Sequence, residues 1–169
     1  MERKSVTHVS TPILEIMTAV TSEINSCKKQ KINSDSITST KTSKLEPLTP
    51  EEASAAVSSF RRILQFETVS SLAPSTGAYR ECALYIQSCL RSISCFTDET
   101  VFFLPEAPAH SPVVVAVWKG TQPDLPVILL NSHYDVVPAN EKDWTVKPFE
   151  GIMKDEKIYG RGAQDMKCV

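Results

Sequence analysis

The chain has 169 residues, 18 of them basic and 20 acidic, and its hydrophobic fraction of 41% is typical of a globular protein. This length suits a single domain with a core of its own. The net charge of −2 argues against nucleic acid as the main partner, because phosphate-binding surfaces normally carry a basic excess. The longest apolar runs fall far short of the roughly 20 residues that a membrane span needs, so we expect no membrane association.

Residues 1–46 differ in composition from the rest of the chain. Their first 44 residues include 15 Ser or Thr, and the stretch 33–44 is almost wholly polar. Such a stretch cannot bury enough apolar surface to offset the entropy of ordering it. We therefore predict a flexible polar extension over 1–46 and a globular part over 47–169.

The N-terminus and the cysteines indicate the compartment. The first residues lack the unbroken apolar segment of a secretory signal. The five cysteines form no Cys-x-x-Cys pair and no spacing typical of a structural zinc module. We expect reduced thiols in a cytoplasmic protein, with a single disulfide as the open alternative.

Two helices are predicted at the start of the globular part. Thr49–Glu52 is a capping box with proline at the first helical position. A second helix should begin at Ser75–Gly77. Each helix has an apolar stripe at spacings of three and four residues, which predicts a buried face. The stripe residues are Ala53, Val57, Phe60 and Leu64 in the first helix, and Tyr79, Ala83, Ile86, Leu90 and Ile93 in the second.

The pattern then changes to short segments rich in β-branched residues. Thr100–Leu104, Val113–Trp118 and Val127–Leu130 are predicted strands separated by Pro and Gly. The last two are apolar almost without alternation, as expected for strands covered on both faces. Residues 151–161 are predicted to form a hairpin. Helices followed by such strands indicate an α/β layered domain.

Two motifs carry side chains suited to chemistry. His133 and Asp135 follow the strand predicted at Val127–Leu130, at the end of a strand where open α/β sheets place their ligands. Neutral imidazole is a good zinc ligand, and a nearby carboxylate can fix its tautomer. The tripeptide alone is equally compatible with a surface turn or a hydrogen-bonded histidine.

The second motif is Gly160–Lys167, with the sequence GRGAQDMK. Its glycines allow a sharp turn after a strand, so that Asp165 projects from a tight corner. A carboxylate has two oxygens and can bridge two cations, although a Gly-rich loop with a solvated Asp fits the same residues. We expect Lys167 to pair with a nearby acid. Spacing alone therefore predicts a possible metal site between two loops.

Three segments, taken together, resemble a known family. They are VILLNSHYDVVPANEKDW, KPFEG and IYGRGAQDMKCV, and they occur in this order. From about Ala53 onward the chain is similar to the N-terminal part of the aminoacylases. These belong to the co-catalytic zinc hydrolases, which also include carboxypeptidases and dipeptidases. The resemblance implies the N-terminal part of a zinc-exopeptidase-like, three-layer α/β/α catalytic domain with an incomplete sheet.

The resemblance also implies roles for three residues. His133 matches a terminal ligand of one zinc ion, and Asp165 matches the carboxylate that bridges two Zn²⁺ ions. Asp135 matches the catalytic-site carboxylate that orients the imidazole. The peptide bond between Asp165 and Met166 is expected to be cis. The implied reaction, a step of amino acid metabolism, is hydrolysis of an N-acyl-L-amino acid to a carboxylate and a free amino acid, by a homodimer in the full-length family.

A complete two-zinc site needs about five protein ligands, whereas this chain offers two at the motif positions. We therefore expect residues 47–169 to be a partial catalytic domain, truncated before the other ligands and the dimerisation domain, with little or no activity alone. Missing neighbouring strands would leave Val127–Leu130 exposed. The alternatives are a metallo-dipeptidase or carboxypeptidase of the same family, or a non-catalytic interaction fragment whose sheet edge pairs with a partner.

Overall fold

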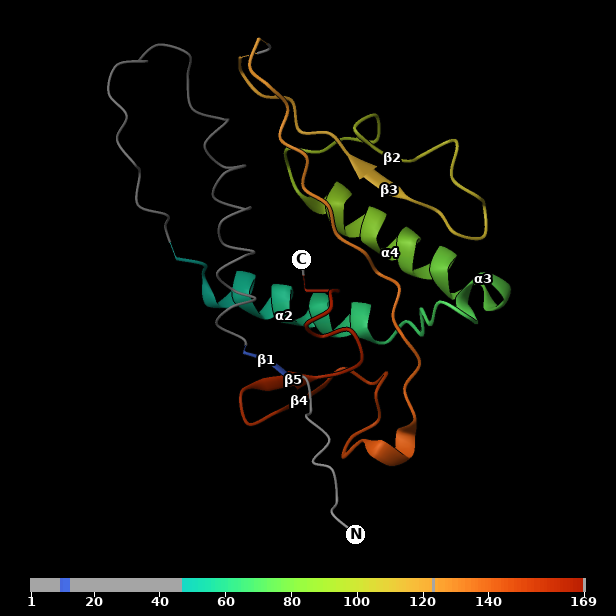
Figure 1. The fold of residues 1–169 in the computed structure, drawn as a ribbon. Coiled ribbons are helices and arrows are strands. Elements are labelled where there is room, and N and C mark those ends of the chain that lie inside the picture. The colour runs from blue at the N-terminus through green and yellow to red at the C-terminus, as the bar shows by residue number, and fades with distance from the viewer. Residues whose placement is uncertain (1–9, 13–46, 123, 169) are drawn as a thin grey trace.

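The structure is a computed structural model that describes residues 10–12, 47–122 and 124–168 (Figure 1). Apart from 10–12, the predicted flexible extension lies outside the described residues, so that prediction and the boundary at 46 stay untested. The elements in chain order are β1 (Ser10–Pro12), α2 (Pro50–Leu64), α3 (Ala73–Thr76), α4 (Ala78–Ser92), β2 (Val101–Phe103), β3 (Val114–Ala116), the 3-10 helix η1 (Glu141–Asp143), β4 (Ile152–Lys154) and β5 (Lys157–Tyr159).

Helix α2 begins as its capping box predicts. The backbone N–H of Glu52 donates to Thr49 Oγ1 at 3.2 Å, and the backbone N–H of Thr49 donates to Glu52 Oε2 at 3.0 Å. Two N–H groups without partners inside the helix are thereby satisfied. The predicted stripe faces inward, with Phe60 and Leu64 buried at its C-terminal end.

The second predicted helix is split into two. Gly77 has φ +81, a left-handed conformation that ends α3 and precedes α4. Within α4, Tyr79 and Ala83 of the predicted stripe are buried, and so is Cys82. Four of the five cysteines lie in the described part, and all four are free thiols.

Strands β2 and β3 form an antiparallel pair beside α4, with Phe102 opposite Val115 (Figure 1). The strand predicted at Val113–Trp118 is therefore present but shorter. Its predicted burial on both faces is wrong, since the residues of β3 are half-buried or exposed. Of the helices in the described part, α4 is the one that packs against this pair.

The predicted hairpin is present as β4 and β5, with β1 pairing along the other edge of β5. Its turn residues Asp155 and Glu156 have φ of 51 and 58, the left-handed geometry of a tight two-residue hairpin turn. From β5, Ile158 packs in one buried cluster with residues of α2 and the loop that follows the hairpin. The buried members are Phe60, Leu64, Ile158 and Ala163.

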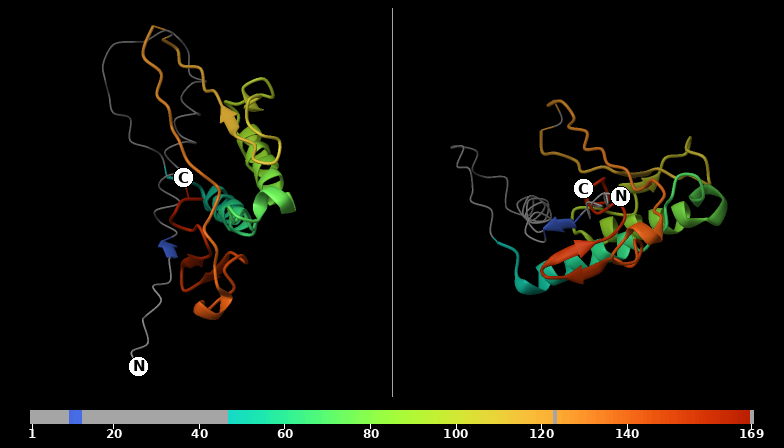
Figure 2. Two further views of the ribbon diagram at one scale, coloured as in Figure 1. Left: turned by 45° about the vertical axis from the view of Figure 1, so that its right-hand side comes forward. Right: turned by 60° about the horizontal axis from the view of Figure 1, so that its bottom comes forward.

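The strand predicted at Val127–Leu130 is absent, and this part of the prediction is wrong. The four residues are 93%, 84%, 85% and 83% exposed. This agrees with the expectation that the run is exposed when its neighbouring strands are missing. Nothing in the described ranges pairs with them through backbone hydrogen bonds. A strand exists only through hydrogen bonds to a neighbour, so this apolar run is extended without being part of a sheet. After residue 124 the chain runs extended along the molecule to η1 (Figures 1 and 2).

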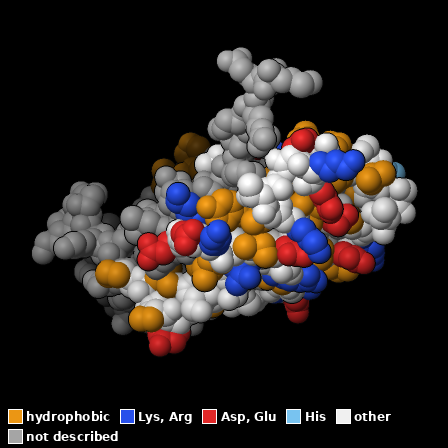
Figure 3. Space-filling view, turned by 90° about the horizontal axis from the view of Figure 1, so that it is seen from below, with side chains coloured by type: hydrophobic (Ala, Val, Ile, Leu, Met, Phe, Trp, Pro, Cys, Tyr) orange, Lys and Arg blue, Asp and Glu red, His pale blue; other side chains and the backbone are white. Residues whose placement is uncertain are grey.

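The described part thus mixes helices with two small antiparallel sheets, which is compatible with the predicted α/β class. The three-layer α/β/α arrangement stays a prediction. On the face shown in Figure 3, acidic and basic side chains are interspersed with apolar ones. None of the helices in the described part has the length and apolar character that crossing a bilayer requires.

Candidate metal centre

The segment that carries His133 and Asp135 is fixed by the loop after α2. Val69 and Val136 form a parallel β-bridge. The Val136 N–H donates to the Thr68 carbonyl at 2.8 Å, and the Ser70 N–H donates to the Val136 carbonyl at 3.0 Å. Thr68 is fully buried, and its hydroxyl donates to the carbonyl of residue 134. This bridge lies at Val136, after the two site residues, whereas the sequence predicted a strand before them, at Val127–Leu130.

Tyr134 anchors the same segment against α4. Its ring meets the Tyr79 ring edge to face, with centroids 5.5 Å apart, and its hydroxyl donates to the Pro112 carbonyl. Burial raises the pKa of Tyr134 to about 12, so the phenol stays protonated and remains a donor at neutral pH. Because successive side chains of an extended segment point in opposite directions, burying Tyr134 turns its two neighbours toward solvent.

The second segment is the turn after β5. Gly162 has φ +88, and a Cβ atom there would lie 2.8 Å from Cγ1 of Val136. Only glycine allows the two segments to approach this closely in this conformation. The Lys167 N–H closes the turn on the Gly162 carbonyl at 2.9 Å, and the peptide bond between Asp165 and Met166 is cis, as the resemblance predicted.

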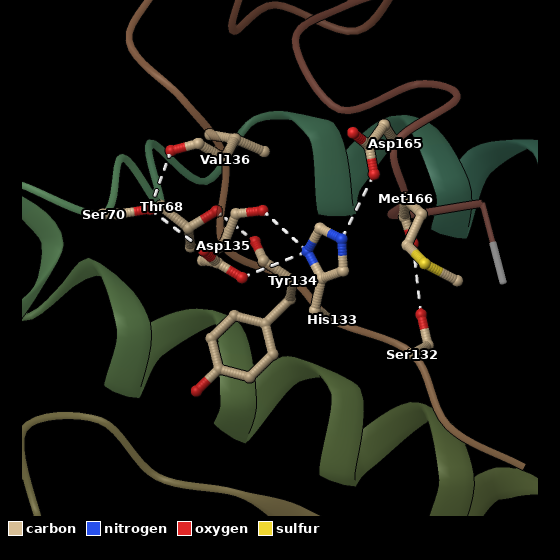
Figure 4. Close-up of polar contacts among 9 residues, drawn as sticks. All are labelled: Thr68, Ser70, Ser132, His133, Tyr134, Asp135, Val136, Asp165 and Met166. Carbon is tan, nitrogen blue, oxygen red and sulfur yellow. Dashed lines mark hydrogen bonds and ion pairs between the residues drawn. The ribbon is translucent and has the colours of Figure 1, made fainter.

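These two segments bring the three predicted site residues together (Figure 4). Nε2 of His133 lies 3.2 Å from Oδ1 of Asp165, and Nδ1 of His133 lies 3.1 Å from Oδ1 of Asp135. The side chains are 46%, 91% and 48% exposed for His133, Asp165 and Asp135 respectively, so the group opens to solvent. The imidazole therefore has one ring nitrogen facing each carboxylate.

Lys167 follows Asp165 by two residues and lies in an environment that the sequence did not predict. It is only 4% exposed, and its Nζ donates to the carbonyls of Phe66 at 2.8 Å and Ile63 at 3.3 Å. These carbonyls lie at the C-terminal end of α2, where a cation is favoured. Burial lowers the pKa of Lys167 to about 8. No acid in the described residues lies within salt-bridge distance of Lys167, so for this part of the chain the expectation of an ion pair is wrong.

Two serines support the group, and no sequence pattern pointed to either of them. Ser70 Oγ donates to Asp135 Oδ2 at 2.9 Å, from a loop 65 residues earlier in the chain. Ser132 Oγ donates to the Met166 carbonyl at 3.1 Å, which ties the two motif segments together. Neither contact belongs to a local spacing pattern, so only the folded chain reveals them.

The donor set suits a divalent metal ion only in part. His133 and Asp165 offer one imidazole nitrogen and one exposed carboxylate on adjacent segments, a mixed N and O donor set that zinc accepts. The Asp135 carboxylate on the other ring nitrogen is the arrangement that orients a metal-binding histidine. In the described residues, however, no group of three or more His, Cys, Asp or Glu side chains could hold a metal ion.

Comparison with known proteins agrees with these motifs. The profile described as "Peptidase family M20/M25/M40" matches residues 129–169, which include all three site residues. The chain is 43% identical to aminoacylase-1 of Sus scrofa over 117 residues, 68% of this chain and 26% of that protein. It is 40% identical to aminoacylase-1 of Homo sapiens over 121 residues, 71% of this chain and 28% of that protein. The chain belongs to peptidase family M20/M25/M40.

Membership of M20/M25/M40 confirms the resemblance predicted from the motifs. A shorter match, 48% identity over 52 residues, links this M20 chain to "Probable carboxypeptidase S-like 1" of Dictyostelium discoideum, covering 31% of this chain and 10% of that protein. The chain spans about a quarter of the length of the aminoacylases that it matches. The activity of the full-length relatives is therefore assigned to this chain only as a proposal.

Proposed function

We propose that the chain carries part of the metal site of an aminoacylase-type amide hydrolase. The observation that carries this proposal is the placement of one imidazole between two carboxylates, at the positions where the resemblance predicted them. His133 faces Asp165 through Nε2 and Asp135 through Nδ1. The M20 match over the same residues supports it independently of the geometry.

Each of the three residues has a distinct role in this proposal. His133 Nε2 and the Asp165 carboxylate would hold Zn²⁺, and the second oxygen of Asp165 would be available to the second zinc ion of a complete site. Asp135 keeps the imidazole in the tautomer that presents Nε2 as a ligand. When bound, the metal pair lowers the pKa of a bound water and polarises the amide carbonyl of the substrate.

The proposed substrate is an N-acyl-L-amino acid, by similarity to the aminoacylase-1 relatives. The carboxypeptidase-like relative favours a peptide C-terminus as the second candidate. Two donors are too few for a pair of zinc ions, so we propose that this chain alone hydrolyses neither substrate at a significant rate. Cytoplasmic location and assembly as a homodimer stay predictions.

Metal binding tests the proposal directly. Titration with Co²⁺, followed by its visible absorption, should show a weak site in the wild-type chain. Asp165→Ala should lose this absorption, whereas Glu106→Ala, which removes an exposed carboxylate elsewhere, should keep it. Equal absorption in the wild type and Asp165→Ala would remove the metal-site proposal. Hydrolysis of acetyl-methionine above the metal-only blank, lost in Asp165→Ala, would instead refute the inactivity of the chain.

A further inference from the structure

One hydroxyl group, that of Ser70, touches the site from outside both motifs. Its Oγ lies 2.9 Å from Oδ2 of Asp135 and 3.2 Å from the carbonyl of Val136 (Figure 4). A hydroxyl has one proton to donate. The closer acceptor is a carboxylate oxygen, which also forms the stronger hydrogen bond because it is charged. The Ser70 proton therefore belongs mainly to Asp135.

The two oxygens of Asp135 then have different partners. Oδ2 accepts from Ser70, and Oδ1 lies 3.1 Å from Nδ1 of His133. A carboxylate held at one oxygen loses rotation about its terminal torsion, which is otherwise broad. With Oδ2 fixed, Oδ1 remains directed at the imidazole ring. Nδ1 of His133 also lies 3.1 Å from the backbone carbonyl of Asp135, so the hydroxyl adds to this backbone contact by restricting the histidine through the carboxylate.

The backbone fixes Ser70 itself. Its N–H donates to the Val136 carbonyl at 3.0 Å, and the preceding residue, Val69, forms the parallel bridge with Val136. Val69 is 6% exposed, and its carbonyl accepts from the N–H groups of Leu72 at 2.9 Å and Ala73 at 2.8 Å. The loop is therefore held on both sides of Ser70. Its hydroxyl reaches Asp135 from a rigid base, as a positioning group requires.

We propose that Ser70 is a positioning residue of the candidate metal centre. Its hydroxyl group holds the Asp135 carboxylate so that the His133 ring keeps Nε2 directed toward Asp165. Ser70 touches neither the substrate nor the metal ion, and it acts only through Asp135. The effect of Ser70 on metal binding rests on the proposed function. Its effect on the orientation of the His133 ring does not.

Three variants test the role of Ser70. Ser70→Ala removes the hydroxyl, Ser70→Thr keeps it and adds a methyl group at an exposed position, and Ser71→Ala removes the neighbouring exposed hydroxyl as a control. The first measurement is the order of the His133 ring by NMR relaxation in the metal-free chain, with exposed His110 as an internal reference. The second is Co²⁺ affinity, and the third is the thermal midpoint of unfolding.

Ser70→Ala should lower the order of the His133 ring toward that of His110 and weaken Co²⁺ binding by about threefold to tenfold, less than loss of a direct partner of the histidine costs. Ser70→Thr should restore both values, and Ser71→Ala should change neither. An unchanged ring in Ser70→Ala would overturn the proposal, as would an equal loss of order in Ser71→Ala. If the wild type binds no Co²⁺, the proposed function fails while the ring measurement still decides the role of Ser70.

Discussion

Two apolar segments of this chain differ in burial, since one is packed in the core and the other is exposed to solvent. The stripe of α2 ends in Phe60 and Leu64, which are 5% and 0% exposed against Ile158 of the hairpin. The run Val127–Leu130 is at least as apolar, yet each of its side chains is more than 80% exposed. Hydrophobicity alone therefore does not decide which segment forms the core.

The difference lies in where each segment finds its partners. A helix satisfies its backbone hydrogen bonds internally and needs neighbours only for its side chains. A strand needs another strand for its backbone as well. For α2 the partners are present in the hairpin and the loop after it. For the run before the candidate site, the described part of the chain supplies no strand to pair with.

The largest expected effect comes from making the same leucine-to-alanine change in the buried segment and in the exposed one. Leu64→Ala should lower the free energy of unfolding by about 2–5 kcal/mol, because it removes buried contacts and leaves a cavity. Leu129→Ala, the same change at an 85% exposed side chain, should alter it by less than about 0.5 kcal/mol. Urea unfolding of both variants measures the difference. A loss for Leu129→Ala that equals the loss for Leu64→Ala would show that the exposed run is packed in solution.

The same division decides how much of the fold the sequence could predict. The cap at Thr49 and the hairpin turn at Asp155 depend on residues close in sequence, and both are present. The strand predicted at Val127–Leu130 depends on distant partners, and it is absent. Strand β3 is also shorter than predicted, and among the described strands it pairs with β2 alone, over three residues. Local chemistry was sufficient for the start of α2 and for the β4–β5 hairpin, but not for the break at Gly77 or for a strand that needs distant partners.

The site divides in a similar way. Spacing gave only a possible metal site, and the resemblance then predicted that His133 and Asp165 would meet, which the 3.2 Å contact shows. Ser70 could not be predicted, since it reaches Asp135 only through the bridge between segments 65 residues apart. Lys167 was misjudged because its partners are backbone carbonyls at a helix end, which leave no mark in the sequence.

A second change tests the close packing between the two motif segments, at the turn that carries Asp165. Gly162→Ala should lower the free energy of unfolding by about 1–3 kcal/mol, because its Cβ would lie 2.8 Å from Val136 at a φ of +88. Gly120→Ala is the matched control, since nothing lies within 4 Å of a Cβ there. Thermal unfolding measures both, and equal midpoints would mean that the two motif segments do not approach this closely.

The smallest expected effect is a pH dependence of the free energy of unfolding, which tests the burial of Lys167. The pKa of Lys167 is lowered to about 8 from 10.5, so between these values the unfolded chain binds more protons than the folded one. Stability should therefore rise with pH from 8, by about 1 kcal/mol up to pH 9. Cys82 opposes this rise, weakly between pH 8 and 9 and strongly above pH 9, because burial raises the pKa of its thiol from 9.0 to about 11 and the unfolded chain loses this proton first.

Urea unfolding at pH 8.0, 8.5 and 9.0 measures this rise, and Lys167→Met should abolish it while retaining an apolar stem of similar length. A flat wild-type profile would mean that the amine reaches water and that the carbonyls of Ile63 and Phe66 do not hold it. Persistence of the rise in Lys167→Met would assign it to another group. The flat profile would remove the link between Lys167 and the C-terminal end of α2, and the turn that carries Asp165 would then be held by the Ser132 hydrogen bond and by the packing of Gly162 against Val136.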